Sequence, residues 1–97
     1  MDSSLFHPEA WEELSERFDY QRYHWPYLLD EWYAVFKSTY ASILEDPTRH
    51  REREFGHRRA QMGKFPHYIA YIIRGDTIWI VAVGSTSQDP LYWKNRI

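Results

Sequence analysis

The most hydrophobic part of the chain covers residues 65–85, and its pattern is typical of two adjacent β-strands. Residues 68–73 and 77–83 are rich in β-branched and aromatic side chains, which pack well on a pleated surface. Between the two runs lies Gly75, which can adopt the positive φ that a tight hairpin turn requires. The sequence therefore predicts an antiparallel hairpin at this point of the chain.

Alternate side chains of a strand point to opposite faces of its sheet. In the first run, one predicted face holds Ile69, Tyr71 and Ile73, and the other holds Tyr68, Ala70 and Ile72. In the second run, the two predicted faces hold Ile78, Ile80 and Ala82, and Trp79, Val81 and Val83. Neither face is polar, so both strands are expected to be central in a sheet that a large element from the first half of the chain covers.

Two helices are predicted in that first half. Pro8 suits the first position of a helix, acidic residues follow it, and the helix is expected to end within residues 20–25. Its apolar stripe is predicted to contain Trp11, Leu14 and Phe18. A longer helix is predicted over residues 26–44, with an apolar face made of Leu29, Trp32, Phe36, Tyr40 and Ile43. These helices are expected to form a hairpin that covers the sheet.

The remaining segments complete the predicted fold. Residues 3–7 are expected to form a first strand, and residues 58–62 another strand after the polar and basic segment 49–59. Residues 86–97 are expected to form a short helical or extended tail. The element order is then β-α-α-β-β-β, which is an α+β fold with a helical hairpin on a small, mainly antiparallel sheet. Residues 1–97 are expected to form a single domain.

Composition and charge narrow the classes of function. The chain has no cysteine, which excludes disulfides, thiolate metal sites and cysteine nucleophiles. No apolar run is long enough to span a membrane and no leader peptide is recognisable, so we expect a cytoplasmic protein without a membrane partner. Residues 1–48 contain three basic and ten acidic side chains, whereas residues 49–97 contain nine basic and four acidic ones. This asymmetry indicates either a basic surface for an acidic partner or simply solvated faces.

Candidate catalytic and cofactor motifs are missing from the sequence. The five histidines have no metal-ligand spacing, and no glycine-rich phosphate loop or nucleophile motif is present. The acidic residues cluster on predicted helix faces, where solvation explains them. We therefore expect no metal and no cofactor.

A set of basic side chains is the strongest candidate for a binding site. Arginine suits phosphate and carboxylate groups through its planar fork, and aromatic rings offer surfaces on which bases stack. If the sheet brings the set together, it forms a cationic patch with aromatic neighbours. The candidate binding residues are Arg58, Arg59, Lys64, Trp93, Lys94 and Arg96, with Tyr92 beside them. A nucleic acid and an acidic protein segment both remain possible ligands for it.

Several segments resemble the RelE/ParE superfamily, the small toxins of bacterial type II toxin–antitoxin modules. The resemblance lies in the element order, in the opening HPEA at residues 7–10, in the strand FPHYIAY at residues 65–71 with the AVG that follows, and in DPLYW at residues 89–93. It covers nearly the whole chain and implies a compact toxin that a cognate antitoxin holds inactive. It also implies one of two targets, because RelE-like members cut mRNA on the ribosome and ParE-like members inhibit DNA gyrase.

The residues that RelE-like members use for cleavage are matched only in part. Arg59 occupies one basic position, and Tyr92 matches a tyrosine near the C-terminus. Gln61 stands where a second lysine is expected, and Tyr68 stands where the central strand carries an arginine. RNA cleavage needs cations for the developing phosphorane charge and a group that moves protons. Arg59 and Tyr92 are thus candidate catalytic residues only if the chain is a nuclease.

The resemblance therefore predicts a growth-inhibiting toxin that acts by binding gyrase and is neutralised by its antitoxin, with operator DNA contacted only through the antitoxin. Two alternatives remain open. One is a RelE-like, ribosome-dependent mRNA endonuclease, and the other is a non-toxic protein-interaction module with the same fold. The aromatic residues Tyr20, Tyr23 and Trp25 are expected either to face a partner or to pack the turn between the helices.

Overall fold

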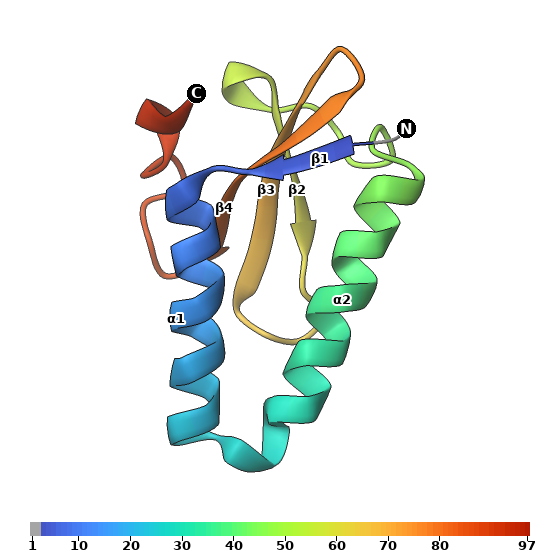
Figure 1. Ribbon diagram of the computed structural model, residues 1–97. Coiled ribbons are helices and arrows are strands. Elements are labelled where there is room, and N and C mark those ends of the chain that lie inside the picture. Colours follow the sequence, from blue (N-terminus) through green and yellow to red (C-terminus); the bar gives the residue numbers. More distant parts are fainter. Residues whose placement is uncertain (1–2) are drawn as a thin grey trace.

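The computed structural model describes residues 3–97, which form a helical hairpin packed on a four-stranded sheet (Figure 1). The helices and strands in chain order are β1 (Ser3–Phe6), α1 (Pro8–His24), α2 (Leu29–Glu45), β2 (His57–Gln61), β3 (His67–Arg74) and β4 (Thr77–Ser85). This order confirms the predicted α+β fold. Among the described residues, no helix is both long enough and apolar enough to cross a membrane.

The strands lie in the order β1-β4-β3-β2. β2 pairs with β3 and β3 with β4 in antiparallel fashion, whereas β1 joins β4 in parallel. The hairpin between β3 and β4 is tight, because Arg74 pairs with Thr77 and Gly75 has a φ of 60°. That positive φ is the conformation expected of the turn glycine.

The ends of the helices follow from local chemistry. His7 caps α1, since its Nδ1 accepts a hydrogen bond from the backbone N–H of Glu9 at 3.1 Å, one of the N–H groups that the first helical turn leaves unpaired. The segment Pro26–Leu28 is a turn of 3₁₀-helix, so α2 begins three residues later than predicted. Asp46 ends α2 directly before Pro47, whose ring disfavours a helical conformation in the preceding residue.

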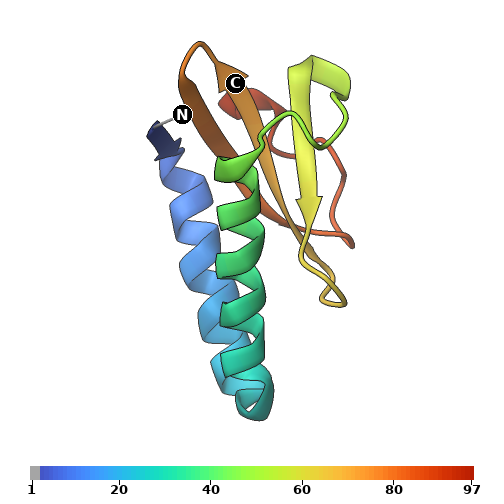
Figure 2. The same cartoon turned by 90° about the vertical axis from the view of Figure 1, so that its right-hand side faces the viewer.

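The helices cover one face of the sheet and project beyond its end (Figures 1 and 2). The buried side chains of this helix-facing core include Trp32, Phe36, Ile43, Met62, Ile69, Tyr71, Ile78, Ile80 and Val83. The stripe predicted for α1 is wrong in one position, because 58% of Trp11 is exposed. Ala10 and Glu13 are the buried residues of that turn, and the burial of Glu13 also corrects the expectation that solvation explains the acidic residues.

A β-bulge changes the predicted faces of β4. The register between β3 and β4 shifts between Ala70 and Tyr71, which leaves Val81 as an extra residue on β4. Beyond the bulge the alternation reverses, so that Val83 joins the helix-facing core and Ala82 the opposite side. The prediction for these two residues was therefore wrong, although the faces of residues 68–72 and 78–81 were right.

The tail formed by residues 86–97 covers the second face of the sheet. The buried residues on this side are Tyr68, Ala70, Ile72, Val81, Ala82 and Trp93, with Trp79, Leu91 and Tyr92 packed against them. Gly84 is required here because a Cβ at this position would lie 2.4 Å from Cζ of Tyr68. The tail consists of turns and a short 3₁₀-helix at Lys94–Arg96, and packing against the sheet determines its course.

Candidate binding site at the tail and the edge of β4

β4 continues beyond the end of its neighbour β1. The parallel pairing ends where Phe6 lies opposite Ile80, and the backbone N–H of His7 then donates to the carbonyl of Ile80 at 2.9 Å. The chain turns away at this point to begin α1. The edge of β4 over residues 81–85 is therefore left without a strand beside it, and unpaired backbone groups at such an edge destabilise a buried sheet.

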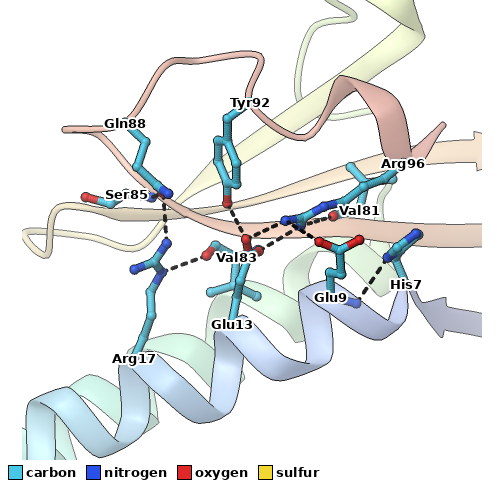
Figure 3. A network of polar contacts seen from close by, with 10 residues as sticks. All are labelled: His7, Glu9, Glu13, Arg17, Val81, Val83, Ser85, Gln88, Tyr92 and Arg96. Atoms are coloured by element: carbon cyan, nitrogen blue, oxygen red, sulfur yellow. Dashed lines mark hydrogen bonds and ion pairs between the residues drawn. The ribbon is translucent and has the colours of Figure 1, made fainter.

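Side chains from α1 and the tail bind this open edge instead of a strand (Figure 3). The four contacts are Arg96 Nη1 to Val81 O at 2.9 Å, Val83 N to Glu13 Oε1 at 3.0 Å, Arg17 Nε to Val83 O at 2.7 Å, and Ser85 N to Gln88 Oε1 at 2.9 Å. Arg17 also donates from Nη2 to Gln88 Oε1 at 2.9 Å. We call Glu13, Arg17, Gln88, Tyr92 and Arg96 the polar clasp, because they join α1, β4 and the tail.

Glu13 is the centre of the polar clasp. Its two carboxylate oxygens accept from Arg96 Nη1 and Nη2 at 3.0 and 2.8 Å, and Oε2 also accepts from the hydroxyl of Tyr92 at 2.8 Å. The side chains of Glu13 and Arg96 are each only 11% exposed. Hydrogen bonding to Glu13 raises the pKa of the Arg96 guanidinium.

Tyr92 is held in its neutral form. Burial, followed by the hydrogen bond to Glu13 and the charge of that carboxylate, raises the pKa of the Tyr92 hydroxyl far above its ordinary value. A general base must release and accept a proton near neutral pH. In this arrangement Tyr92 donates a structural hydrogen bond and does not exchange protons.

Trp93 anchors the tail on the sheet. It is completely buried, and its ring lies edge-on to His57 with 4.4 Å between the ring centroids. Truncation of a buried aromatic side chain of this size typically destabilises a protein by about 3–5 kcal/mol. The prediction that Trp93 offers a surface for stacking is therefore corrected, because the ring packs in the core.

Arg59 is committed to neighbours on the same face. Its Nε donates to Nε2 of His57 at 3.0 Å, its Nη2 donates to the carbonyl of Pro90, and its guanidinium lies 4.5 Å from the ring centroid of Tyr68. His57 in turn donates from Nδ1 to the carbonyl of Glu54 at 2.6 Å. Burial lowers the pKa of His57, which is consistent with a neutral ring that accepts from Arg59.

The structure does not bring the predicted basic residues into one patch. Arg58 and Arg59 are adjacent in β2 and point to opposite faces, and Arg58 donates to the carbonyl of His50 at 2.6 Å. Lys64 lies in the turn between β2 and β3, 3.0 Å from Glu31 of α2. Of the predicted cations, Lys94 is exposed, and its side chain has neither a hydrogen bond nor an ion pair within the described part of the chain. The predicted patch is thus divided among three places, with Lys94 the cation available to a partner.

The described residues contain no group of three or more histidine or acidic side chains that could hold a metal ion. The side chains of the polar clasp are paired with one another or with the edge of β4. The hydroxyl of Tyr68 and the indole N–H of Trp93, by contrast, are buried without a hydrogen-bond partner in the described part of the chain. The polar clasp fixes the tail on the sheet and presents the outer surface of the tail to solvent.

A helical hairpin on a β1-β4-β3-β2 sheet, with a tail folded over the second face, defines a protein of the RelE/ParE fold class. The model of the family described as the ParE toxin of the type II toxin–antitoxin system parDE matches residues 5–90. The chain therefore belongs to the ParE toxin family. A comparison with curated proteins gives no match.

The family match ends at Pro90, so Tyr92 and Arg96 of the polar clasp lie beyond it, whereas Glu13, Arg17 and Gln88 lie within it. Sequence analysis did not identify these last three as site residues. Glu13 and Arg17 lie four residues apart, and α1 places side chains at that spacing on one face. That spacing was the available signal, although it does not reveal that the face meets β4.

Proposed function

We propose that this protein is a toxin of a type II toxin–antitoxin pair, that it inhibits growth by binding DNA gyrase, and that a cognate antitoxin neutralises it in the cytoplasm. Membership of the ParE toxin family supports the proposal. The resemblance found in the sequence points to gyrase as the target of ParE-like members and to an antitoxin as their partner.

The state of the candidate catalytic residues favours binding over RNA cleavage. Tyr92 donates its hydroxyl to Glu13, and Arg59 is engaged by His57 and Pro90. Cleavage requires cations that face the phosphate and a group whose pKa allows proton transfer at neutral pH. Arg96 is likewise paired with a buried carboxylate, so these groups stabilise the tail and are not directed at a substrate. This is the observation that carries the proposal of a binding toxin.

We further propose that the outer surface of the tail contacts the target through Lys94. This lysine follows the buried Trp93 and is exposed at the start of the last 3₁₀-helix. A cation without an acidic neighbour attracts an acidic group of a partner at little desolvation penalty. Arg58, Arg59 and Arg96, which the sequence also suggested as binding residues, would then act indirectly by holding the sheet and tail in place.

The experiment that tests the proposal is supercoiling of relaxed plasmid by purified gyrase. The purified protein is expected to inhibit supercoiling, and its antitoxin, the product of the neighbouring gene, is expected to restore it. Lys94→Ala is expected to raise the half-inhibitory concentration roughly twofold to fivefold, the effect of one exposed ion pair. Asn95→Ala, at the adjacent exposed position, is the matched control. Full supercoiling at a large excess of folded protein would contradict the proposal.

A further inference from the structure

A pocket of about 660 Å³ borders the polar clasp, since Arg17 belongs to both, and it lies toward the end of the sheet past which the helical hairpin projects (Figures 1 and 2). Its walls come from the second half of α1, the turn between the helices, the start of β3 and the end of β4. No residue of the described chain fills it. A concave space of this size with apolar walls is the usual form of a ligand site.

The walls of the pocket are largely aromatic. They include Tyr20, Trp25 and Tyr27, which are 56%, 46% and 76% exposed, together with Phe65 and Pro66 from the opposite side. Exposed aromatic side chains gathered around a depression mark interaction sites more often than isolated exposed residues do. Tyr23, which is 84% exposed, lies next to this wall, since its ring and that of Tyr20 both contact the ring of His24. An occupant of this surface is therefore expected to be longer than a single small molecule.

Arg17 supplies a positive charge to the pocket. Its guanidinium has five N–H donors, of which two bind the neutral oxygens of Val83 and Gln88. Three donors remain, and Arg17 forms no ion pair with another described residue. The charge is held in place by these two hydrogen bonds, so it is pre-organised for a bidentate contact with a carboxylate.

His67 adds a second donor. The indole N–H of Trp32, which can only donate, binds Nδ1 of His67 at 3.1 Å. Burial lowers the pKa of His67 to about 4, so the ring is neutral and carries its proton on Nε2. This Nε2–H has no hydrogen-bond partner in the described part of the chain, and His67 lines the pocket. The pocket therefore combines aromatic walls with donors from Arg17 and His67.

We propose that this pocket binds an extended segment of a partner protein in which a large apolar side chain stands beside a carboxylate. The apolar side chain lies against Tyr20, Trp25 and Phe65, and the carboxylate accepts hydrogen bonds from Arg17. A nucleic acid fits less well, since Arg17 is the one cationic side chain of the lining and the acidic Glu16 lies next to it. One carboxylate matches one guanidinium, whereas a phosphate backbone requires several cations. The inference is independent of toxicity and of gyrase.

A library of random dodecapeptides displayed on phage, selected on the whole protein, tests this proposal. Peptides that bind are expected to share a large apolar residue next to Asp or Glu. A synthetic, terminally blocked peptide from this set is expected to lose at least about tenfold in affinity when its acidic residue becomes Gln, the loss typical of a charge-assisted hydrogen bond. The variant Arg17→Gln is expected to cause the same loss for the acidic peptide and no further loss for the Gln peptide.

Tyr27→Ala removes part of the wall without removing any hydrogen bond, and it is expected to weaken both peptides equally. This variant keeps the test valid if Arg17→Gln proves unstable, and Glu12→Gln, on the same helix outside the pocket lining, is the control. Three results would each overturn the proposal. The first is a selection that enriches no more peptides on this protein than on an unrelated protein. The second is a set of selected peptides that contain no acidic residue. The third is binding of the free carboxylate indole-3-propionate that is as tight as binding of the best peptide.

Discussion

Removal of either charge from the buried pair of Glu13 and Arg96 is expected to destabilise the protein strongly. Glu13→Gln keeps the shape of the side chain but leaves the guanidinium of Arg96 with only the exposed carboxylate of Glu9, 3.6 Å away, as an ion-pair partner. Arg96→Met keeps much of the apolar volume but leaves the carboxylate of Glu13 bound only by Val83 N and the Tyr92 hydroxyl. In both variants a charge that is mostly shielded from water loses its buried, hydrogen-bonded partner.

The magnitude follows from burial. Each side chain of the pair is 11% exposed, and loss of one partner of a buried ion pair typically destabilises a protein by about 3–5 kcal/mol. In a domain of this length that loss lowers the melting temperature by about 15–25 °C. The double variant removes both charges together, so it is expected to lose about 2 kcal/mol less than the sum of the two single variants.

Urea unfolding of the original protein, the two single variants and the double variant measures the coupling free energy between Glu13 and Arg96. Glu12→Gln is the matched control, because Glu12 is exposed on the same helical turn, and its effect is expected to stay within about 0.5 kcal/mol. Single variants as stable as this control would refute the reasoning. So would additive effects of Glu13→Gln and Arg96→Met, since additivity means that the two side chains do not interact.

Two further perturbations test other parts of the structure. Gly84→Ala is expected to destabilise the protein by about 1–3 kcal/mol in urea unfolding, because its Cβ overlaps the buried ring of Tyr68. A loss within about 0.5 kcal/mol, the range of ordinary surface substitutions, would contradict this. His67, with its pKa lowered to about 4, binds its proton more readily in the unfolded chain. Stability is therefore expected to fall as the pH drops from about 6.5 toward 4. His67→Gln should flatten that fall, and an unchanged profile would refute the assignment.

The fold was predictable because its signals are local. The β-branched and aromatic runs at residues 68–73 and 77–83 became the centres of β3 and β4, and Gly75 took the positive φ that was expected of it. The apolar spacing of α2 likewise indicated its buried face. The reversed faces of Ala82 and Val83 were not predictable, since the bulge at Val81 depends on pairing with β3 and has no signature in the sequence of β4.

The candidate site was less predictable because its contacts are distant in sequence. Arg96 was expected to be free for a ligand, but Glu13, 83 residues earlier, holds it. Neither residue differs in type or spacing from an ordinary solvated charge. The separation of Arg58 from Arg59 was foreseeable, by contrast, since neighbours in a strand point to opposite faces. Trp93 was expected to take part in binding, although the apolar residues on both predicted faces of 68–73 and 77–83 did indicate a second face that another segment must cover.

Tyr92→Phe distinguishes a tail that serves binding from a tail that takes part in RNA cleavage. This variant removes the hydroxyl that a nuclease would use, while the pairing of Glu13 with Arg96 and the packing of the ring remain. It is expected to lose about 1 kcal/mol of stability and to inhibit gyrase and bacterial growth as the original protein does. Folded Tyr92→Phe protein that no longer arrests growth, together with mRNA cuts made by the original protein and absent with the variant, would contradict the account.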